Sequence, residues 1–168
     1  EVTAGFRMNP GGVHLTLGVE PDLAVFAKAL GNGYPISAVI GRRGVMEVAQ
    51  DTFISSTAWT ERVGFAAALA TLDVFERDKV HEHLVRIGGR IREVWQNAAE
   101  AAGLPIKVRG LPPLSTFAFL DDEPLLLKTC FIQSMLEVDF LASTAFYATA
   151  AHRDEDVDDY AVQVARVF

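Results

Sequence analysis

The chain has 168 residues, enough for one ordinary domain or two small lobes, and half of them are hydrophobic. This composition allows a sizeable core and excludes a disordered chain. The formal net charge of −7 argues against non-specific binding of nucleic acid and suits a soluble cytoplasmic protein. No apolar run approaches the ~18 residues that a membrane span needs.

The chain begins with Glu1-Val2-Thr3 rather than with methionine, and apolar segments follow almost at once. We therefore expect the chain to be a part of a longer protein. Any function that needs the other part is then incomplete in this chain.

The first 60 residues predict two short strands, a short helix and a loop. Residues 22–26 form an apolar run, which predicts a buried strand that ends near Lys28. Residues 36–40 predict a second strand and residues 43–50 a short helix. The stretch 53–59 is rich in serine and threonine and predicts a loop.

Two helices follow this loop. Residues 61–77 are rich in alanine and apolar on most sides, which predicts a buried helix. The segment after Asp78 has apolar residues at i, i+3 and i+4 spacing, and Gly103 ends it, as is usual for a residue that follows a helix. The junction near residue 77 is the predicted domain boundary.

The last 65 residues alternate between strands and helices. The expected order is strand, strand, helix, strand, helix, over residues 106–109, 115–120, 123–137, 138–141 and 154–168. The first turn of the final helix is acidic, which the helix dipole favours. The alternation predicts an α/β or α+β lobe.

Cys130 is the only cysteine, so an internal disulfide and a cysteine-based zinc site are excluded. It lies in the largely apolar stretch Thr129-Cys130-Phe131-Ile132, and no basic partner that would activate a thiolate is evident. We therefore predict a buried, inert thiol.

Lys28 is the most informative single residue. It follows the apolar run of residues 22–26 and precedes a glycine-rich turn. A lysine at the end of a buried strand is costly unless it is paired or neutral, and a neutral amine is the nucleophile that forms Schiff bases. A lysine whose side chain extends from the strand end into water is the alternative, and this environment alone favours it.

The segments Glu1-Val-Thr-Ala-Gly-Phe-Arg7 and residues 21–36 around Lys28 resemble the core of class III aminotransferases, which are fold-type I enzymes that use pyridoxal phosphate (PLP). In that family an Asp-Glu-Val motif, whose aspartate pairs with the pyridine nitrogen, precedes a lysine motif. The resemblance implies that Lys28 binds PLP as a Schiff base. It also implies that the pyridine-binding aspartate stands immediately before Glu1.

A second segment, Ser55-Ser-Thr57-Ala-Trp-Thr60, resembles the family loop whose threonine reaches the cofactor phosphate of the neighbouring subunit. The resemblance implies that Thr57 binds this phosphate, as a hydroxyl is able to do. The alternative is an ordinary turn before a helix, with Thr60 as the N-cap.

The third match lies at residues 151–158, which resemble the opening of the last helix in the glutamate-1-semialdehyde aminomutase branch. This match points to helix capping, so His152 is not a predicted catalytic base. The other histidines, His14, His81 and His83, are not predicted to be catalytic or to bind a metal, since the last two face different sides of a helix.

The resemblance implies an α/β fold in which residues 1–77 are the C-terminal part of the PLP-binding large domain, a mixed sheet with helices. Residues 78–168 would be a small C-terminal α+β domain. The implied activity is PLP-dependent transamination between a small amino donor and a keto or aldehyde acceptor, in a homodimer with shared active sites. This chain alone would be inactive.

Two departures from the aminomutase branch favour a related aminotransferase. Residues 143–152 lack the glutamate of that branch, and Gly-Asn-Gly-Tyr-Pro at residues 31–35 replaces its usual run of glycines. A PLP aminomutase, racemase or decarboxylase stays an alternative, as does a non-catalytic interaction module of the same fold. A nucleotide-binding protein is disfavoured because no complete G-x-G-x-x-G or P-loop pattern is present.

Overall fold

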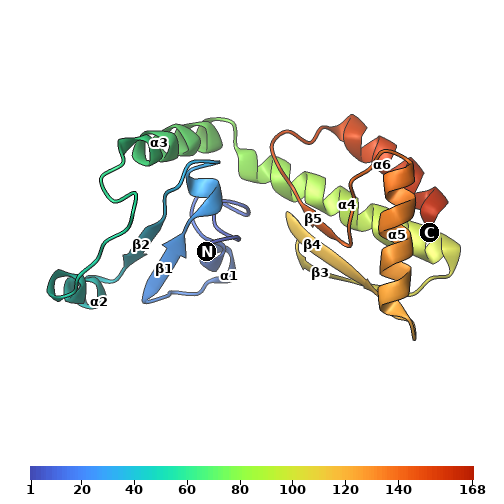
Figure 1. The fold of residues 1–168 in the computed structure, drawn as a ribbon, viewed down its shortest axis with the longest axis horizontal. Coiled ribbons are helices and arrows are strands. Elements are labelled where there is room, and N and C mark those ends of the chain that lie inside the picture. The colour runs from blue at the N-terminus through green and yellow to red at the C-terminus, as the bar shows by residue number, and fades with distance from the viewer. The chain divides into compact units, whose positions relative to one another are not determined.

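The computed structural model describes residues 1–168, which separate into two compact units, Glu1–Glu82 and His83–Phe168 (Figure 1). The helices and strands of the N-terminal unit are α1 (Val13–Leu17), β1 (Leu23–Phe26), η1 (Lys28–Leu30), β2 (Ala38–Gly41), α2 (Arg43–Met46), η2 (Glu47–Asp51) and α3 (Arg62–Arg77). Those that follow are α4 (Val80–Ala102), β3 (Ile106–Leu111), β4 (Leu114–Phe119), α5 (Pro124–Glu137), β5 (Ala145–Tyr147) and α6 (Asp154–Val167).

The alternation of helices and strands confirms the α/β class, and both sheets within the chain are antiparallel. The assignment of residues 1–77 and 78–168 to a large and a small domain stays a prediction. No helix combines the length and hydropathy that a membrane crossing requires.

The N-terminal unit is built on a two-stranded sheet in which Leu23 of β1 lies opposite Gly41 of β2. One face of β1 packs on the core through Phe26, which is 5% exposed. The prediction of a buried strand is wrong for the other face, because Val25 is 39% exposed. In this chain β1 pairs only with β2, so its other edge has no partner strand.

Helix α3 was also expected to be buried, and this prediction is wrong. Only one side packs, through Gly64, Ala68 and Phe75, while Phe65 and Leu69 are 59% and 66% exposed. The helix starts after Glu61, whose side chain accepts a hydrogen bond from the backbone of Val63, so Thr60 is not the N-cap.

The C-terminal unit contains the sheet β3-β4-β5 with helices packed on it. Strands β3 and β4 form a hairpin that turns at Pro112 and Pro113. Strand β3 extends beyond its predicted end at residue 109, and β4 begins and ends one residue earlier than predicted. The prediction of an extended segment at residues 138–141 is wrong. The third strand is instead Ala145–Tyr147, because its backbone pairs with residues 114–116 of β4.

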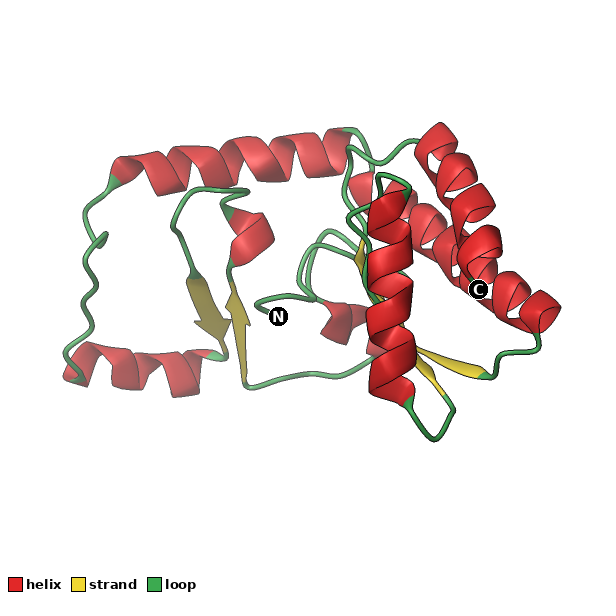
Figure 2. Cartoon of the chain, turned by 45° about the vertical axis from the view of Figure 1, so that its right-hand side comes forward, coloured by secondary structure: helices red, strands yellow, loops and turns green.

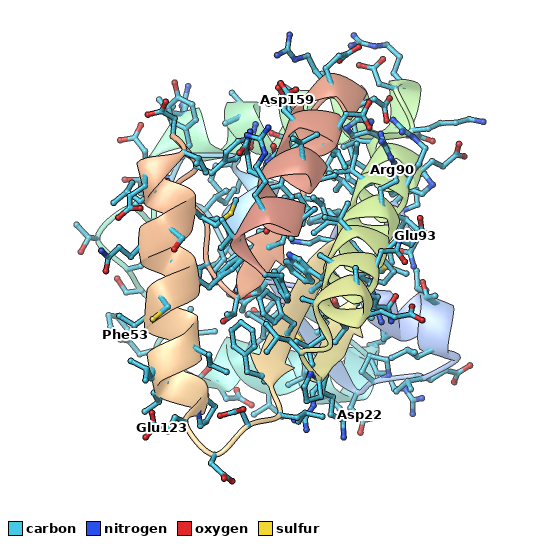
Figure 3. The ribbon with its side chains drawn as sticks, turned by 90° about the vertical axis from the view of Figure 1, so that its right-hand side faces the viewer. Asp22, Phe53, Arg90, Glu93, Glu123 and Asp159 are labelled. Carbon is cyan, nitrogen blue, oxygen red and sulfur yellow. The ribbon has the colours of Figure 1, made fainter.

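The core of this unit is aromatic and aliphatic. Phe117 of β4 packs against Trp95 of α4 in a tilted arrangement and edge-to-face against Phe131 of α5, at ring-centroid distances of 4.9 and 5.4 Å. The Trp95 indole N–H donates a 2.8 Å hydrogen bond to the hydroxyl of Tyr160 on α6. Burial of this hydroxyl raises the pKa of Tyr160 to about 12. Figure 3 shows the three helices side by side, with α6 between α4 and α5.

Helix α5 is apolar nearly all round, and only Phe131 and Met135 are buried. The prediction of a buried Cys130 is wrong, because this residue lies with Leu125 and Leu126 on the exposed side of the helix. An apolar neighbourhood in the sequence therefore did not predict burial.

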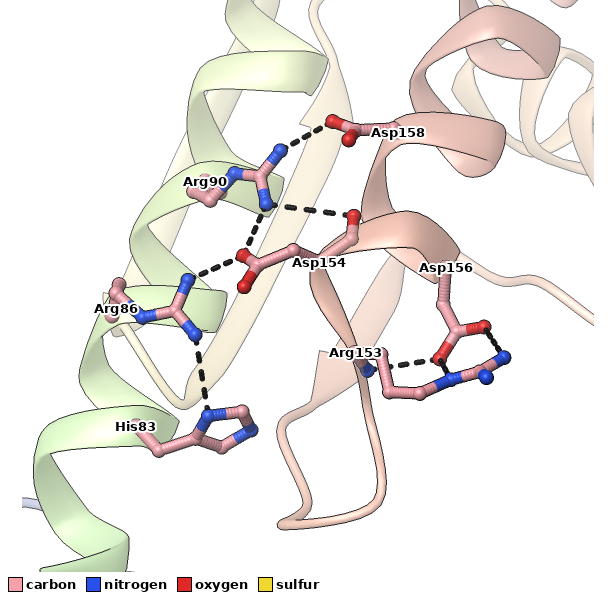
Figure 4. Close-up of polar contacts among 7 residues, drawn as sticks. All are labelled: His83, Arg86, Arg90, Arg153, Asp154, Asp156 and Asp158. Carbon is pink, nitrogen blue, oxygen red and sulfur yellow. Dashed lines mark hydrogen bonds and ion pairs between the residues drawn. The ribbon is translucent and has the colours of Figure 1, made fainter.

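Charged side chains fix the start of α6 on α4 (Figure 4). Arg86 and Arg90 both pair with Asp154, and Arg90 also pairs with Asp158. The Asp156 carboxylate accepts hydrogen bonds from the backbone N–H and the guanidinium of Arg153, and these bonds lower the pKa of Asp156 to about 2. Exposed pairs of this kind contribute little to stability individually, about 0–1 kcal/mol each.

Two adjacent glycines of α4 give a matched test of the packing. A Cβ at Gly88 would lie 2.0 Å from the carbonyl oxygen of Pro112, whereas a Cβ at Gly89 would meet nothing within 4 Å. We expect Gly88→Ala to lower the free energy of unfolding by about 2 kcal/mol or more. Gly89→Ala should raise it by up to about 1 kcal/mol, since alanine favours the helix.

Urea unfolding curves of the two variants and the parent protein provide the measurement. Equal effects of the two substitutions would contradict the close contact between α4 and the β3–β4 turn.

Candidate functional site

Lys28 lies just beyond the end of β1, at the first position of the 3₁₀ turn η1. Its φ is +47°, a left-handed conformation that is uncommon for a residue other than glycine. Two residues later Leu30 is 6% exposed and packs in the same buried cluster as Phe26. The backbone on both sides of Lys28 is therefore fixed on the core, while the side chain of Lys28 is exposed.

The Lys28 amine has a single hydrogen-bond partner in the chain. Its Nζ donates to Thr3 Oγ1 at 2.7 Å, and Lys28 takes part in no ion pair with a carboxylate. A primary amine that is exposed and bound to a neutral hydroxyl is accessible for reaction with a carbonyl group.

Thr3 belongs to a compact turn at the start of the chain. The Gly5 N–H donates to the Glu1 carbonyl oxygen at 2.8 Å, and the Arg7 guanidinium donates to the Thr3 carbonyl oxygen at 2.8 Å. Phe6 packs on Phe26 with ring centroids 5.2 Å apart. The turn thus lies against the end of β1, beside Lys28.

Glu1 connects the same turn to α1, a helix that was not predicted from the sequence. Its carboxylate accepts hydrogen bonds from the backbone N–H groups of Val13 and His14, both at 3.0 Å, and contacts the His14 ring at 2.8 Å. Burial raises the pKa of Glu1, but the hydrogen bonds from His14 and Val13 outweigh it, so the net pKa lies below the usual value. The sequence motif by itself does not predict this structural role of the Glu1 carboxylate.

Thr57 lies in the long connection of residues 52–61 between η2 and α3, which contains no helix or strand (Figure 2). Its side chain is exposed, and no hydrogen bond joins it to Lys28 or to another residue of this chain. Within the chain the structure therefore does not link the two residues that the sequence singled out.

Two hollows in the surface lie elsewhere. One of about 380 Å³ is lined by residues of α1, β1 and β2, and one of about 240 Å³ lies in the C-terminal unit beside His152. The His152 ring accepts a hydrogen bond from the Thr149 backbone at 3.0 Å, in keeping with a structural role. No group of three or more His, Cys, Asp or Glu side chains is arranged to hold a metal ion.

The family model for class III aminotransferases matches residues 1–134. The chain is 31% identical to a 3-aminobutyryl-CoA aminotransferase of Cloacimonas acidaminovorans over 99% of this chain and 41% of that protein. It is 32% identical to a glutamate-1-semialdehyde 2,1-aminomutase of Desulfitobacterium hafniense, over 99% of this chain and 42% of that protein.

Among solved structures, the FumI protein of a Sphingopyxis species, described as the PLP internal aldimine form, superposes with a TM-score of 0.91 and 28% identity. This similarity covers 99% of the present chain and 41% of that one. The chain therefore spans less than half the length of the relatives that it matches.

The Glu1 carboxylate gives a prediction about acid stability. Folding lowers the pKa of Glu1. The contribution of Glu1 to the free energy of unfolding is therefore fully present above pH ~4.5 and is lost as the pH falls through the lower pKa of the folded state. We expect Glu1→Gln to lower the free energy of unfolding by about 1–2 kcal/mol at pH 7. The variant should also lack the part of the pH dependence of stability that the Glu1 carboxylate causes.

Unfolding free energies from urea titrations between pH 3 and pH 7 provide the measurement. Glu20→Gln is the control, since Glu20 is highly exposed and pairs only with Arg42 at 3.4 Å. Identical pH profiles for Glu1→Gln and the parent protein would contradict the assignment.

Proposed function

Because the chain belongs to the class III aminotransferase family, we propose that it forms the lysine-bearing part of a PLP-dependent aminotransferase. Lys28 would hold the cofactor covalently through its amine. Residues 1–77 would complete the large domain of the whole enzyme, and residues 78–168 would form its small domain. The remaining part of the enzyme would come from residues outside this chain, as in the relatives, of which the chain spans about 41%.

The observation that carries this proposal is the state of the Lys28 side chain. The amine is exposed, has a neutral hydroxyl as its partner and forms no ion pair with a carboxylate. Its left-handed backbone costs free energy, of the order of 1 kcal/mol or more, and residues in such conformations are concentrated at functional sites. These features fit an amine that must reach a carbonyl carbon of the cofactor.

When bound, PLP supplies an electron sink for the substrate carbon. Lys28 would have two tasks beside it. It would hold the cofactor between reactions, and its free neutral amine would take a proton from the substrate carbon at Nζ and return it at the next step. The surface of this chain around Lys28 is open, so exclusion of water would depend on the rest of the enzyme.

Thr57 would bind the cofactor phosphate of a neighbouring subunit, in a homodimer that shares its active sites. Its exposed hydroxyl is free of hydrogen bonds within the chain, which leaves it available to a phosphate oxygen. Phe53 and Trp59 of the same connection are 96% and 57% exposed, and large apolar side chains of this kind are typical of surfaces that an assembly buries.

The substrates would be a small amino donor and a keto or aldehyde acceptor, and the acidic composition suits a cytoplasmic enzyme. Glutamate-1-semialdehyde aminomutase activity is the second candidate. The 32% identical relative of that name and the resemblance at residues 151–158 support it, whereas the missing glutamate in residues 143–152 argues for another substrate.

Substitution of Lys28 tests the proposal in the full-length enzyme. Lys28→Ala should abolish covalent attachment of PLP and lower transamination by about 10²-fold to 10⁴-fold or more, because the proton-transfer group is lost. Reduction with borohydride followed by peptide mass spectrometry locates the attached cofactor. Lys79→Ala is the matched control, since Lys79 is also exposed and also has a positive φ, of +48°.

Retention of borohydride-stable PLP in Lys28→Ala would remove Lys28 from the mechanism. Loss of attachment in the Lys79 variant would show that the effect is not specific.

The role of Thr57 has its own test. Thr57→Ala should weaken PLP binding roughly tenfold or more, because a hydrogen bond to a charged group is lost, while Thr57→Ser keeps the hydroxyl. Thr60→Ala is the control from the same turn, since Thr60 does not cap α3. Fluorescence titration of the apoenzyme with PLP measures the affinity.

A mixed dimer of one Lys28→Ala subunit and one Thr57→Ala subunit decides whether Thr57 acts across the interface. One of its two sites should then contain both native residues and regain normal PLP affinity. Two defective sites in the mixed dimer would contradict a role in the neighbouring subunit.

A further inference from the structure

The contact between Lys28 and Thr3 joins residues that are 25 positions apart in the chain. A lysine amine ends a flexible four-carbon side chain with many rotamers, so its position depends on the groups that bind it. Here the Thr3 hydroxyl, 2.7 Å from Nζ, is the only hydrogen-bonding partner. The location of the amine therefore depends on how firmly Thr3 is held.

Hydrogen bonds within the first turn of the chain restrain the backbone of Thr3. Its carbonyl oxygen accepts the hydrogen bond from Arg7, and its own turn is closed by the bond from the Gly5 N–H to Glu1. Threonine is also restricted in χ1, because two heavy atoms branch from its Cβ. The Thr3 side chain is half-buried, so the hydroxyl has few alternative partners in water.

Gly5 allows this turn to pack closely on the end of β1. A Cβ at Gly5 would lie 2.7 Å from the Phe26 ring and 2.7 Å from the Glu1 carbonyl oxygen. Only glycine lets the turn approach the end of β1 this closely. Phe26 stands two residues before Lys28, so this close approach brings Thr3 to the amine.

We propose that Thr3 is a positioning residue for Lys28, an inference that rests on the proposed function of Lys28 in transamination. The Thr3 oxygen accepts one N–H of the free amine and so directs the nitrogen lone pair toward the substrate carbon. In the proton transfer a C–H bond of the substrate breaks and an N–H bond at Nζ forms. PLP, when bound, would accept the electron pair of the C–H bond, and Thr3 gains and loses no proton.

Thr3→Val in the full-length enzyme removes the hydroxyl and keeps the shape. We expect kcat to fall about 10-fold to 100-fold with little change in the KM of the amino donor, since the amine is misplaced but the substrate site is intact. With a substrate deuterated at the reacting carbon, the kinetic isotope effect should rise because proton transfer becomes slower. Borohydride-stable PLP on Lys28 should persist.

A second readout needs no cofactor. In the apoenzyme, pulse acetylation of Lys28 relative to Lys79 should become about 2-fold to 10-fold faster in Thr3→Val, because the hydrogen bond no longer restrains the amine. Thr16→Val is the matched control, since Thr16 accepts a 2.6 Å hydrogen bond from Asn9 in the same unit but does not contact Lys28. Thr3→Ser should restore kcat and the slow labelling.

The outcomes separate the two proposals. Normal kcat, isotope effect and labelling in Thr3→Val, with an inactive Lys28→Ala, would overturn the role of Thr3 and leave that of Lys28 intact. A Thr3→Ser enzyme as slow as Thr3→Val would also overturn the role of Thr3. Because serine keeps the hydroxyl, this variant still tests the role if the valine variant fails to fold. Retention of covalent PLP in Lys28→Ala would instead refute the proposed function.

Discussion

The close approach of the first turn to the end of β1 is the constraint on which the candidate site depends. Because Gly5 has no Cβ, it lies directly against the Phe26 ring, and the ring of the next residue, Phe6, packs on the same ring at a tilt. The turn is thereby fixed to the strand that leads to Lys28. The Thr3–Lys28 hydrogen bond and the contact of Glu1 with α1 both follow from this placement.

The backbone of Lys28 is rigidly placed although its side chain is exposed. Buried side chains on either side, Phe26 and Leu30, anchor the chain while the lysine itself adopts a left-handed conformation and an exposed side chain. A conformation that costs free energy persists only where the surroundings enforce it. The core of the N-terminal unit thus determines where the amine lies, although the amine is not part of the core.

The two units differ in how completely they bury their apolar residues. In the C-terminal unit, Trp95 and Phe117 form a closed centre between the sheet and the helices. In the N-terminal unit, one face of α3 and one face of β1 expose large apolar side chains such as Phe65. Extended apolar surfaces of this kind are typical of places where further protein packs.

Local patterns determined much of the secondary structure and the family. The periodic helices and Gly103 after α4 were predictable from the sequence because helix periodicity and glycine at a positive φ are local properties. Lys28 was recognisable from its motif, although its chemistry was not decided by its neighbours in sequence. The α/β class and the class III family also followed from the sequence.

Tertiary structure decided the rest. The third strand of the C-terminal sheet lies at Ala145–Tyr147 because pairing with β4 selects it, and Cys130 is exposed because α5 turns its other side to the core. The partner of Lys28 could not be predicted, since Thr3 is 25 residues away and reaches the amine only when Gly5 meets Phe26. Contacts between distant segments depend on packing, which local sequence patterns do not encode.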